Sequence, residues 1–129
     1  MEFDGTDDAY NWPFIYAVEV GEWQLTQAQA NKLRDYLLRG GFFMADGCHG
    51  TAEWAYFEKT MKMVFPERQL VDIPNDDPIF HTVFNLDDRM QIVGAEHLRE
   101  GHKKDGYVAR WMGIYDDKGR LMEIGRAHV

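Results

Sequence analysis

The sequence contains a single cysteine, Cys48, so no disulfide can form within the chain. Basic residues are also scarce, because 14 Lys and Arg stand against 22 Asp and Glu, which gives a net charge of -8 at pH 7. A deficit of this kind argues against binding to a phosphate backbone, which needs a basic surface. No apolar run approaches the roughly 20 residues of a membrane-spanning helix. The composition therefore predicts no nucleic-acid partner and no membrane span in this chain.

The chain also opens without the charged and then apolar segment that marks a signal peptide. Taken alone, this absence predicts a cytoplasmic location. The length of 129 residues and the hydrophobic share of 45% are those of a single globular domain with a real core.

A strand, a helix and a second strand follow one another between residues 12 and 50. Residues 14–18 are apolar, residues 26–39 have the period of an amphipathic helix, and residues 42–46 form a second strand with four apolar residues followed by Asp46. This order is typical of a parallel βαβ unit, in which ligands bind where the strands end. The residues at the two predicted strand ends are Glu19, Asp46, Gly47, Cys48 and His49.

The rest of the pattern adds one helix and three strands. A second helix is predicted over residues 51–64, and residues 69–73 have the composition of a third strand. Residues 107–115 and a strand that starts at residue 120 flank the turn 116–119. This arrangement predicts an antiparallel hairpin after the parallel unit.

The last seven residues differ from the pattern before them, because the final strand shows no periodicity after Met122. Residues 123–129 also match the translation of a common short-read sequencing adapter, whose codons spell EIGRAHV. We therefore predict that residues 1–122 are a partial native domain, that residues 123–129 are adapter translation, and that the native strand continues beyond Met122. The alternative is a true short C-terminal tail.

Five motifs are spread along the chain: WPFIY at 12–16, LRDYLLRGGF at 33–42, VFP at 64–66, DPIFH at 77–81 and WMGIYDD at 111–117. In this order they resemble an uncharacterised bacterial family, domain-of-unknown-function family 4159. The resemblance covers residues 2–122.

This resemblance implies an α/β fold of the class I glutamine-amidotransferase-like type, a flavodoxin-like three-layer sandwich. The sandwich is expected to be incomplete here, with a C-terminal β-hairpin. Family members have an earlier strand and helix, and after the position of Met122 they continue into an acidic, aromatic segment and a final helix. The chain is then a fragment truncated at both ends. Many family members look exported, which makes the cell envelope the alternative location.

A nucleophile elbow is the first candidate site. Residues 47–50 (GCHG) lie between a predicted strand and a predicted helix, where amidotransferase-like folds place a nucleophilic cysteine. Asp46, Cys48 and His49 are therefore candidate catalytic residues. Asp46 is bulky for the near side of an elbow, and most relatives carry an aromatic residue at the place of Cys48. Both departures favour a free, semi-buried thiol.

A polar cluster around the same strand ends is the second candidate. His49 and Glu53 lie one helical turn apart if the helix begins near Gly50, so they can face one ligand together with Asp46, although their spacing is not that of a strict metal site. Glu19 and Asp46 can form an acid–base pair across neighbouring strands. The predicted binding residues are Glu19, Asp46, Gly47, His49, Glu53 and His81. The plainer alternative is that the acids complement a helix dipole or bind local amides, and that His81 is structural.

Two functions follow from these candidates. The first is a non-catalytic module that binds a small ligand or a protein partner, as amidotransferase-like folds do when they lose their triad. The second is a hydrolase or amidase-like enzyme that uses Asp46, Cys48 and His49, with or without a metal. The imperfect elbow favours the binding module. No cofactor is indicated by the sequence.

Overall fold

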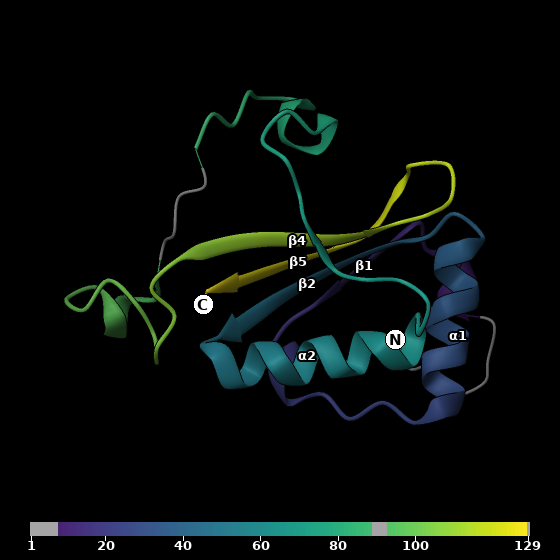
Figure 1. The fold of residues 1–129 in the computed structure, drawn as a ribbon, viewed down its shortest axis with the longest axis horizontal. Helices are drawn as coiled ribbons and strands as arrows, with labels where there is room; N and C mark the ends of the chain where they lie inside the picture. Colours follow the sequence, from purple (N-terminus) through teal and green to yellow (C-terminus); the bar gives the residue numbers. More distant parts are fainter. Residues whose placement is uncertain (1–7, 89–92, 129) are drawn as a thin grey trace.

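The computed structural model describes residues 8–88 and 93–128, and Val129 of the predicted tail lies outside this range. The described residues form a mixed α/β domain with one five-stranded sheet and two α-helices, as Figure 1 shows. The strands are β1 (Phe14–Ala17), β2 (Phe42–His49), β3 (Val71–Asp72), β4 (Ala109–Tyr115) and β5 (Leu121–His128). The helices are α1 (Gln27–Leu38) and α2 (Thr51–Val64). The predicted α/β class is therefore confirmed.

The strand order in the sheet is β1-β2-β5-β4-β3. β1, β2 and β5 are parallel, whereas β4 runs antiparallel to both β5 and β3. The predicted parallel βαβ unit corresponds to β1, α1 and β2, and the predicted hairpin corresponds to β4 and β5. The last strand along the chain thus occupies the centre of the sheet, between the parallel pair and the antiparallel pair.

Helix α1 begins where the sequence predicts it, because Thr26 closes a capping box. The Thr26 hydroxyl accepts a hydrogen bond from the backbone N–H of Gln29, and the Gln29 side chain accepts one from the N–H of Thr26. Leu33 and Leu37, one turn apart, are completely buried against the sheet. The capping box and the buried leucines together fix α1 against the parallel strands.

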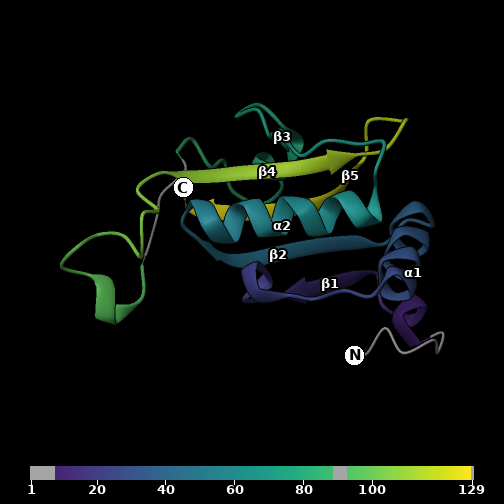
Figure 2. The ribbon, with the colours of Figure 1, turned by 60° about the horizontal axis from the view of Figure 1, so that its bottom comes forward.

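Both α-helices pack on the same face of the sheet (Figures 1 and 2). Phe57 and Met61 of α2 join Leu33 of α1 and Phe43 of β2 in one buried cluster. The opposite face is covered by the segment around the short helix Pro78–His81, whose Phe80 packs in a second, smaller cluster. Among the described residues no α-helix covers that face, so the three-layer sandwich stays a prediction.

Several strands differ from their predicted lengths. β3 spans Val71–Asp72 instead of residues 69–73, and β4 begins at Ala109 instead of residue 107. β2 continues through Gly47, Cys48 and His49 instead of ending at Asp46, and its register to β5 shifts between Ala45 and Cys48. β5 continues to His128, through the part of the sequence that has no strand periodicity. It is a strand because it pairs with β2 on one side and with β4 on the other, so hydrogen bonds to two neighbours hold its backbone whatever its side chains are.

Candidate functional site

The carboxyl ends of β1, β2 and β5 meet at one edge of the sheet, as they must in parallel strands. A cavity of about 250 Å³ lies at this edge, and the segment from residue 93 to residue 106 passes beyond the strand ends (Figure 1). The residues from the strands and their ends that line it are Val18, Glu19, Asp46, Gly47, His49, Arg126 and His128. Four of the six predicted binding residues, Glu19, Asp46, Gly47 and His49, are thus brought together.

The backbone at the cavity wall is strained. Glu19, directly after β1, has the left-handed conformation with φ 55° and ψ 35°, which is uncommon for a residue with a side chain. Gly47 has φ 90° and faces Glu19, because a Cβ atom on Gly47 would lie 2.7 Å from the Glu19 backbone nitrogen. Strain of this kind costs about 1–3 kcal/mol per residue and is found most often at ligand sites. The two strand ends can approach this closely only with glycine at position 47.

Asp46 is held in place by three donors. Its Oδ2 accepts a hydrogen bond from the Tyr16 hydroxyl at 3.0 Å, and its Oδ1 accepts from the Gly47 N–H at 2.8 Å and from Arg126 Nε at 3.2 Å. The bond to Asp46 raises the pKa of Tyr16, so the phenol stays protonated and keeps donating. The carboxylate is therefore presented in a fixed orientation at the cavity wall.

His49 lies at the end of β2 with an imidazole that is neutral at pH 7. Burial is the main cause that lowers the pKa of His49, and the Lys103 ammonium lowers it further. Its Nδ1 is buried without a hydrogen-bond partner, and its ring centroid is 5.3 Å from that of His128. A neutral imidazole with an unpartnered nitrogen can accept or donate one hydrogen bond to a ligand.

Glu53 belongs to the support of the site rather than to its wall. One of its carboxylate oxygens accepts the backbone N–H of His49 at 2.7 Å, and the other forms an ion pair with the Lys104 ammonium. Burial raises the pKa of Glu53, but these two donors together bring it below its ordinary value. Glu53 therefore stays ionised and fixes the end of β2 against the first turn of α2, instead of facing a ligand beside His49.

The Cys48 thiol points away from the cavity. Only 2% of Cys48 is exposed, and the residue belongs to the cluster under the helices. Burial, followed by the charges of Glu53 and Glu123, raises the pKa of the thiol to about 12. A reactive cysteine is partly exposed and has a lowered pKa, so Cys48 has the features of a structural thiol. The predicted elbow is absent because residues 47–49 continue β2 and the turn is made at Gly50.

The family model described as "Domain of unknown function (DUF4159)" matches residues 4–126. The chain belongs to this family. A search of the curated proteins found no match. The resemblance expected from the five sequence motifs is confirmed at the level of the family.

The part of the DUF4159 site that sequence reasoning missed is the segment 93–106. Glu96, His97 and Lys103 line the cavity from this segment. Asp105 joins the segment to α2, since its carboxylate accepts hydrogen bonds from the Thr51 N–H at 3.0 Å and from the Thr51 hydroxyl at 2.6 Å. Asp105 thus caps a helix that is far away in the sequence. The high density of charged residues between positions 96 and 105 is the feature of the sequence that could have indicated a contribution of this segment to the site.

His81 of the DUF4159 domain does not reach the cavity. It lies in the short helix over the opposite face, where its ring nitrogens bond to the Asn75 carbonyl at 2.8 Å and to Asn85 Oδ1 at 3.1 Å. These two hydrogen bonds raise the pKa of His81. The contacts agree with the structural alternative for this residue.

Two further observations bear on the chemistry of the domain. Within residues 8–88 and 93–128, no group of three or more His, Cys, Asp or Glu side chains is arranged to hold a metal ion. No helix in the same range is long and apolar enough to cross a membrane. The cavity is thus a polar site built from side chains and strand ends.

Proposed function

We propose that this DUF4159 domain is a non-catalytic module that binds a small molecule with a positively charged group in the cavity at the strand ends. The observation that carries the proposal is the charge of the cavity wall. Three carboxylates, those of Glu19, Asp46 and Glu96, line it. The opposing cations are Lys103 and Arg126, and the nearby His49 is neutral. The surplus of negative charge favours an ammonium or guanidinium group.

The size of the cavity supports a small ligand. A volume of about 250 Å³ lies below the usual range for pockets that hold drug-sized molecules, about 300–1,000 Å³. Asp46 is the natural anchor for the cationic group because Tyr16 and the Gly47 N–H already fix its carboxylate. His49 also lines the cavity and brings a neutral imidazole to its wall.

The contacts of Cys48 and Glu53 favour binding over catalysis. The thiol is buried with a pKa of about 12, and Glu53 is occupied by the His49 N–H and by Lys104. A hydrolase at this site would have to rely on Asp46 and His49 alone. A nucleophile with an activating base, which covalent catalysis requires, is therefore missing from the cavity wall among the described residues.

We propose in addition that residues 123–129 are adapter translation, so that the native site does not include Arg126 and His128. Six buried side-chain polar atoms in the described chain lack a hydrogen-bond partner, and four of them belong to Glu123 and His128. Buried polar groups in natural proteins nearly always have partners. The family match extends through residue 126, so the family has a segment at the place of β5. Without Arg126 the cavity becomes more negative, and the preference for a cation becomes stronger.

Long-read sequencing of the gene tests the proposal about the tail. A reading frame that departs from EIGRAHV after Met122 supports it. A frame that encodes the same seven residues contradicts it. In the second case Arg126 belongs to the native cavity, which keeps a surplus of negative charge.

Isothermal titration with 1,4-diaminobutane as the cationic probe tests the binding function, and glutarate serves as the anionic probe of similar length. We expect the diamine to bind and glutarate not to bind. Asp46→Asn should weaken diamine binding by about tenfold, which corresponds to 1.4 kcal/mol. Asp76→Asn is the matched control because Asp76 is exposed and distant in the fold. Higher salt should weaken binding, since the attraction is electrostatic.

Glu19→Gly separates the role of the Glu19 carboxylate from the role of the Glu19 backbone. Glycine adopts the left-handed conformation at position 19 without strain, so this variant removes the carboxylate and keeps the turn. We expect a stable protein with weaker diamine binding. Binding of glutarate in place of the diamine would contradict the proposal. Hydrolysis of a small amide that disappears in His49→Ala would establish the hydrolase instead.

A further inference from the structure

A second cavity lies beside α2 and is separate from the cavity at the strand ends. Its volume is about 380 Å³, larger than the cavity at the strand ends. It lies between α2, the segment that precedes β3, and β4. Met61 and Ile114, each 2% exposed, form its floor together with the partly buried Leu70. The floor is thus continuous with the main core of the domain.

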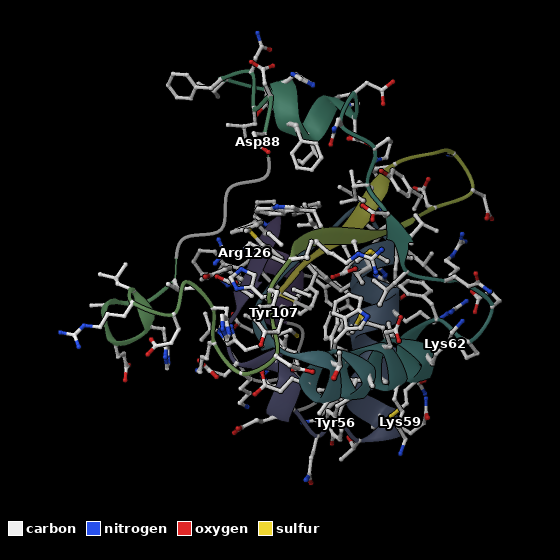
Figure 3. All side chains as sticks on the ribbon, turned by 60° about the vertical axis from the view of Figure 1, so that its left-hand side comes forward. Tyr56, Lys59, Lys62, Asp88, Tyr107 and Arg126 are labelled. Carbon is white, nitrogen blue, oxygen red and sulfur yellow. The ribbon has the colours of Figure 1, made fainter. Side chains whose placement is uncertain are left out.

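The rim of this cavity is cationic, although the chain as a whole has a net charge of -8. Lys59 and Lys62 project from α2 (Figure 3), and Arg68 faces them from the segment before β3. Glu58 is the one acidic residue of the lining. Arg68 is paired with Asp117 at 2.9 Å, so Lys59 and Lys62 stand against Glu58 and give this groove a positive surplus, the opposite in charge to the cavity at the strand ends.

The contacts of the three cations leave binding capacity in the groove. Lys62 donates to the Arg68 carbonyl at 2.5 Å, and Arg68 donates to the Tyr115 carbonyl and to Asp117 through its two terminal nitrogens. Arg68 Nε is buried without a hydrogen bond, because the nearest carboxylate oxygen, on Glu67, is 3.9 Å away and too distant to accept one. Lys59 has no ion-pair partner among residues 8–88 and 93–128.

We propose that this groove binds an amphipathic monocarboxylate with a medium-length acyl chain. The chain would lie on Met61, Leu70 and Ile114, where it removes apolar surface from water. The carboxylate would lie at the rim, where the ammonium groups of Lys59 and Lys62 neutralise its charge and donate hydrogen bonds to it. The charge complementarity selects an anion, and the apolar floor selects against small hydrophilic anions. This site is independent of the proposed function, since it shares no residue with the cavity at the strand ends.

Binding of decanoate, measured by isothermal titration below its micelle-forming concentration, tests the proposal. Decanol has the same chain without the charge, and acetate has the charge without the chain. We expect decanoate to bind and both other compounds to bind at least tenfold more weakly. Equal affinity for decanol would overturn the role of the cations. Equal affinity for acetate would overturn the role of the apolar floor.

Two variants locate the decanoate site. Ala55 lies on the exposed side of α2 in the lining, so Ala55→Trp should fill the groove and abolish binding without disturbing the core. Lys59→Gln should weaken binding by about tenfold. Lys32→Gln is the matched control with no expected effect, because Lys32 lies over the Tyr10 ring on α1 and lines neither cavity. Decanoate binding that survives Ala55→Trp would refute the site. Diaminobutane binding should be unchanged in both variants, which keeps this test distinct from that of the proposed function.

Discussion

Replacing Glu123 by leucine should stabilise the protein, although the substitution lies in the central strand. Glu123 is completely buried, and neither of its carboxylate oxygens has a hydrogen-bond partner. It is the register partner of Phe43, so its side chain enters the core beneath the helices. Leucine has one side-chain heavy atom fewer than glutamate, so it fits the same space.

The expected increase in the free energy of unfolding can be estimated from two contributions. An unpartnered buried polar group costs about 1–3 kcal/mol, a cost that leucine removes. A fully buried leucine contributes about 1.5–3 kcal/mol relative to an exposed one. Part of this gain is lost to imperfect packing, so we expect the free energy of unfolding to rise by about 3 kcal/mol at neutral pH. For a domain of this size, that change raises the melting temperature by roughly 10 °C.

The stabilisation by Glu123→Leu should increase with pH. Burial raises the pKa of Glu123 well above 4.5, so the folded state keeps the carboxyl protonated at a pH where the unfolded state has lost the proton. The folded state then binds more protons, and the contribution of Glu123 to stability falls as pH rises from its ordinary pKa to its folded pKa. Leucine removes this dependence. The difference in stability between the two proteins should therefore be smallest near pH 4 and grow as the pH rises above it.

Urea denaturation followed by circular dichroism at several pH values measures this difference. Glu123→Gln is the informative control, because it removes the titration and keeps an unpartnered polar group of the same shape. It should abolish the pH dependence and recover only part of the gain. If Glu123→Leu destabilises the protein, or if the difference between the two proteins does not change with pH, the carboxyl has a partner and the reasoning fails.

Three further predictions concern the scaffold. Gly47→Ala should lower the free energy of unfolding by about 3 kcal/mol, because the new Cβ would collide with the Glu19 backbone and the φ of residue 47 is positive. Gly119 has a similar φ of 79° but open space around it, so Gly119→Ala should cost clearly less in the same urea denaturation. Thr26→Ala removes the cap of α1 and should cost about 1 kcal/mol, whereas Thr26→Ser should restore most of that stability. Cys48 should not react with a thiol-specific disulfide reagent in the native protein and should react fully in denaturant, and fast native labelling would contradict its burial.

The elements with strong local signals could be predicted from the sequence. α1 follows from its capping box and apolar period, and α2 starts and ends within a residue of the predicted range 51–64. The position of β5 could not be predicted in the same way. A strand at the centre of a sheet is held by backbone bonds to both neighbours, so it tolerates side chains such as Glu123 and His128 that give no strand pattern.

The candidate site was predicted in part. The rule that ligands bind at the ends of parallel strands singled out Glu19, Asp46 and His49, and these three residues line one cavity in the structure. Two predicted members lie elsewhere for reasons that only the tertiary structure contains. Glu53 is occupied by a backbone amide and by Lys104, and His81 is bound by groups on the opposite face. The contribution of the segment 93–106 depends on its return to the strand ends, which no local pattern encodes.

The central place of β5 has a consequence for synthesis on the ribosome. Within the described residues, β5 is the strand that joins the pair β1 and β2 to the pair β3 and β4, and it follows the other four strands in the sequence. Until β5 leaves the exit tunnel, β2 and β4 each carry an edge of unpaired amides and carbonyls, the kind of edge that recruits chaperones or a neighbouring nascent chain. The five-stranded sheet is therefore expected to close only once β5 has left the tunnel, and changes in β5 should alter the yield of soluble protein more strongly than equal changes in β1.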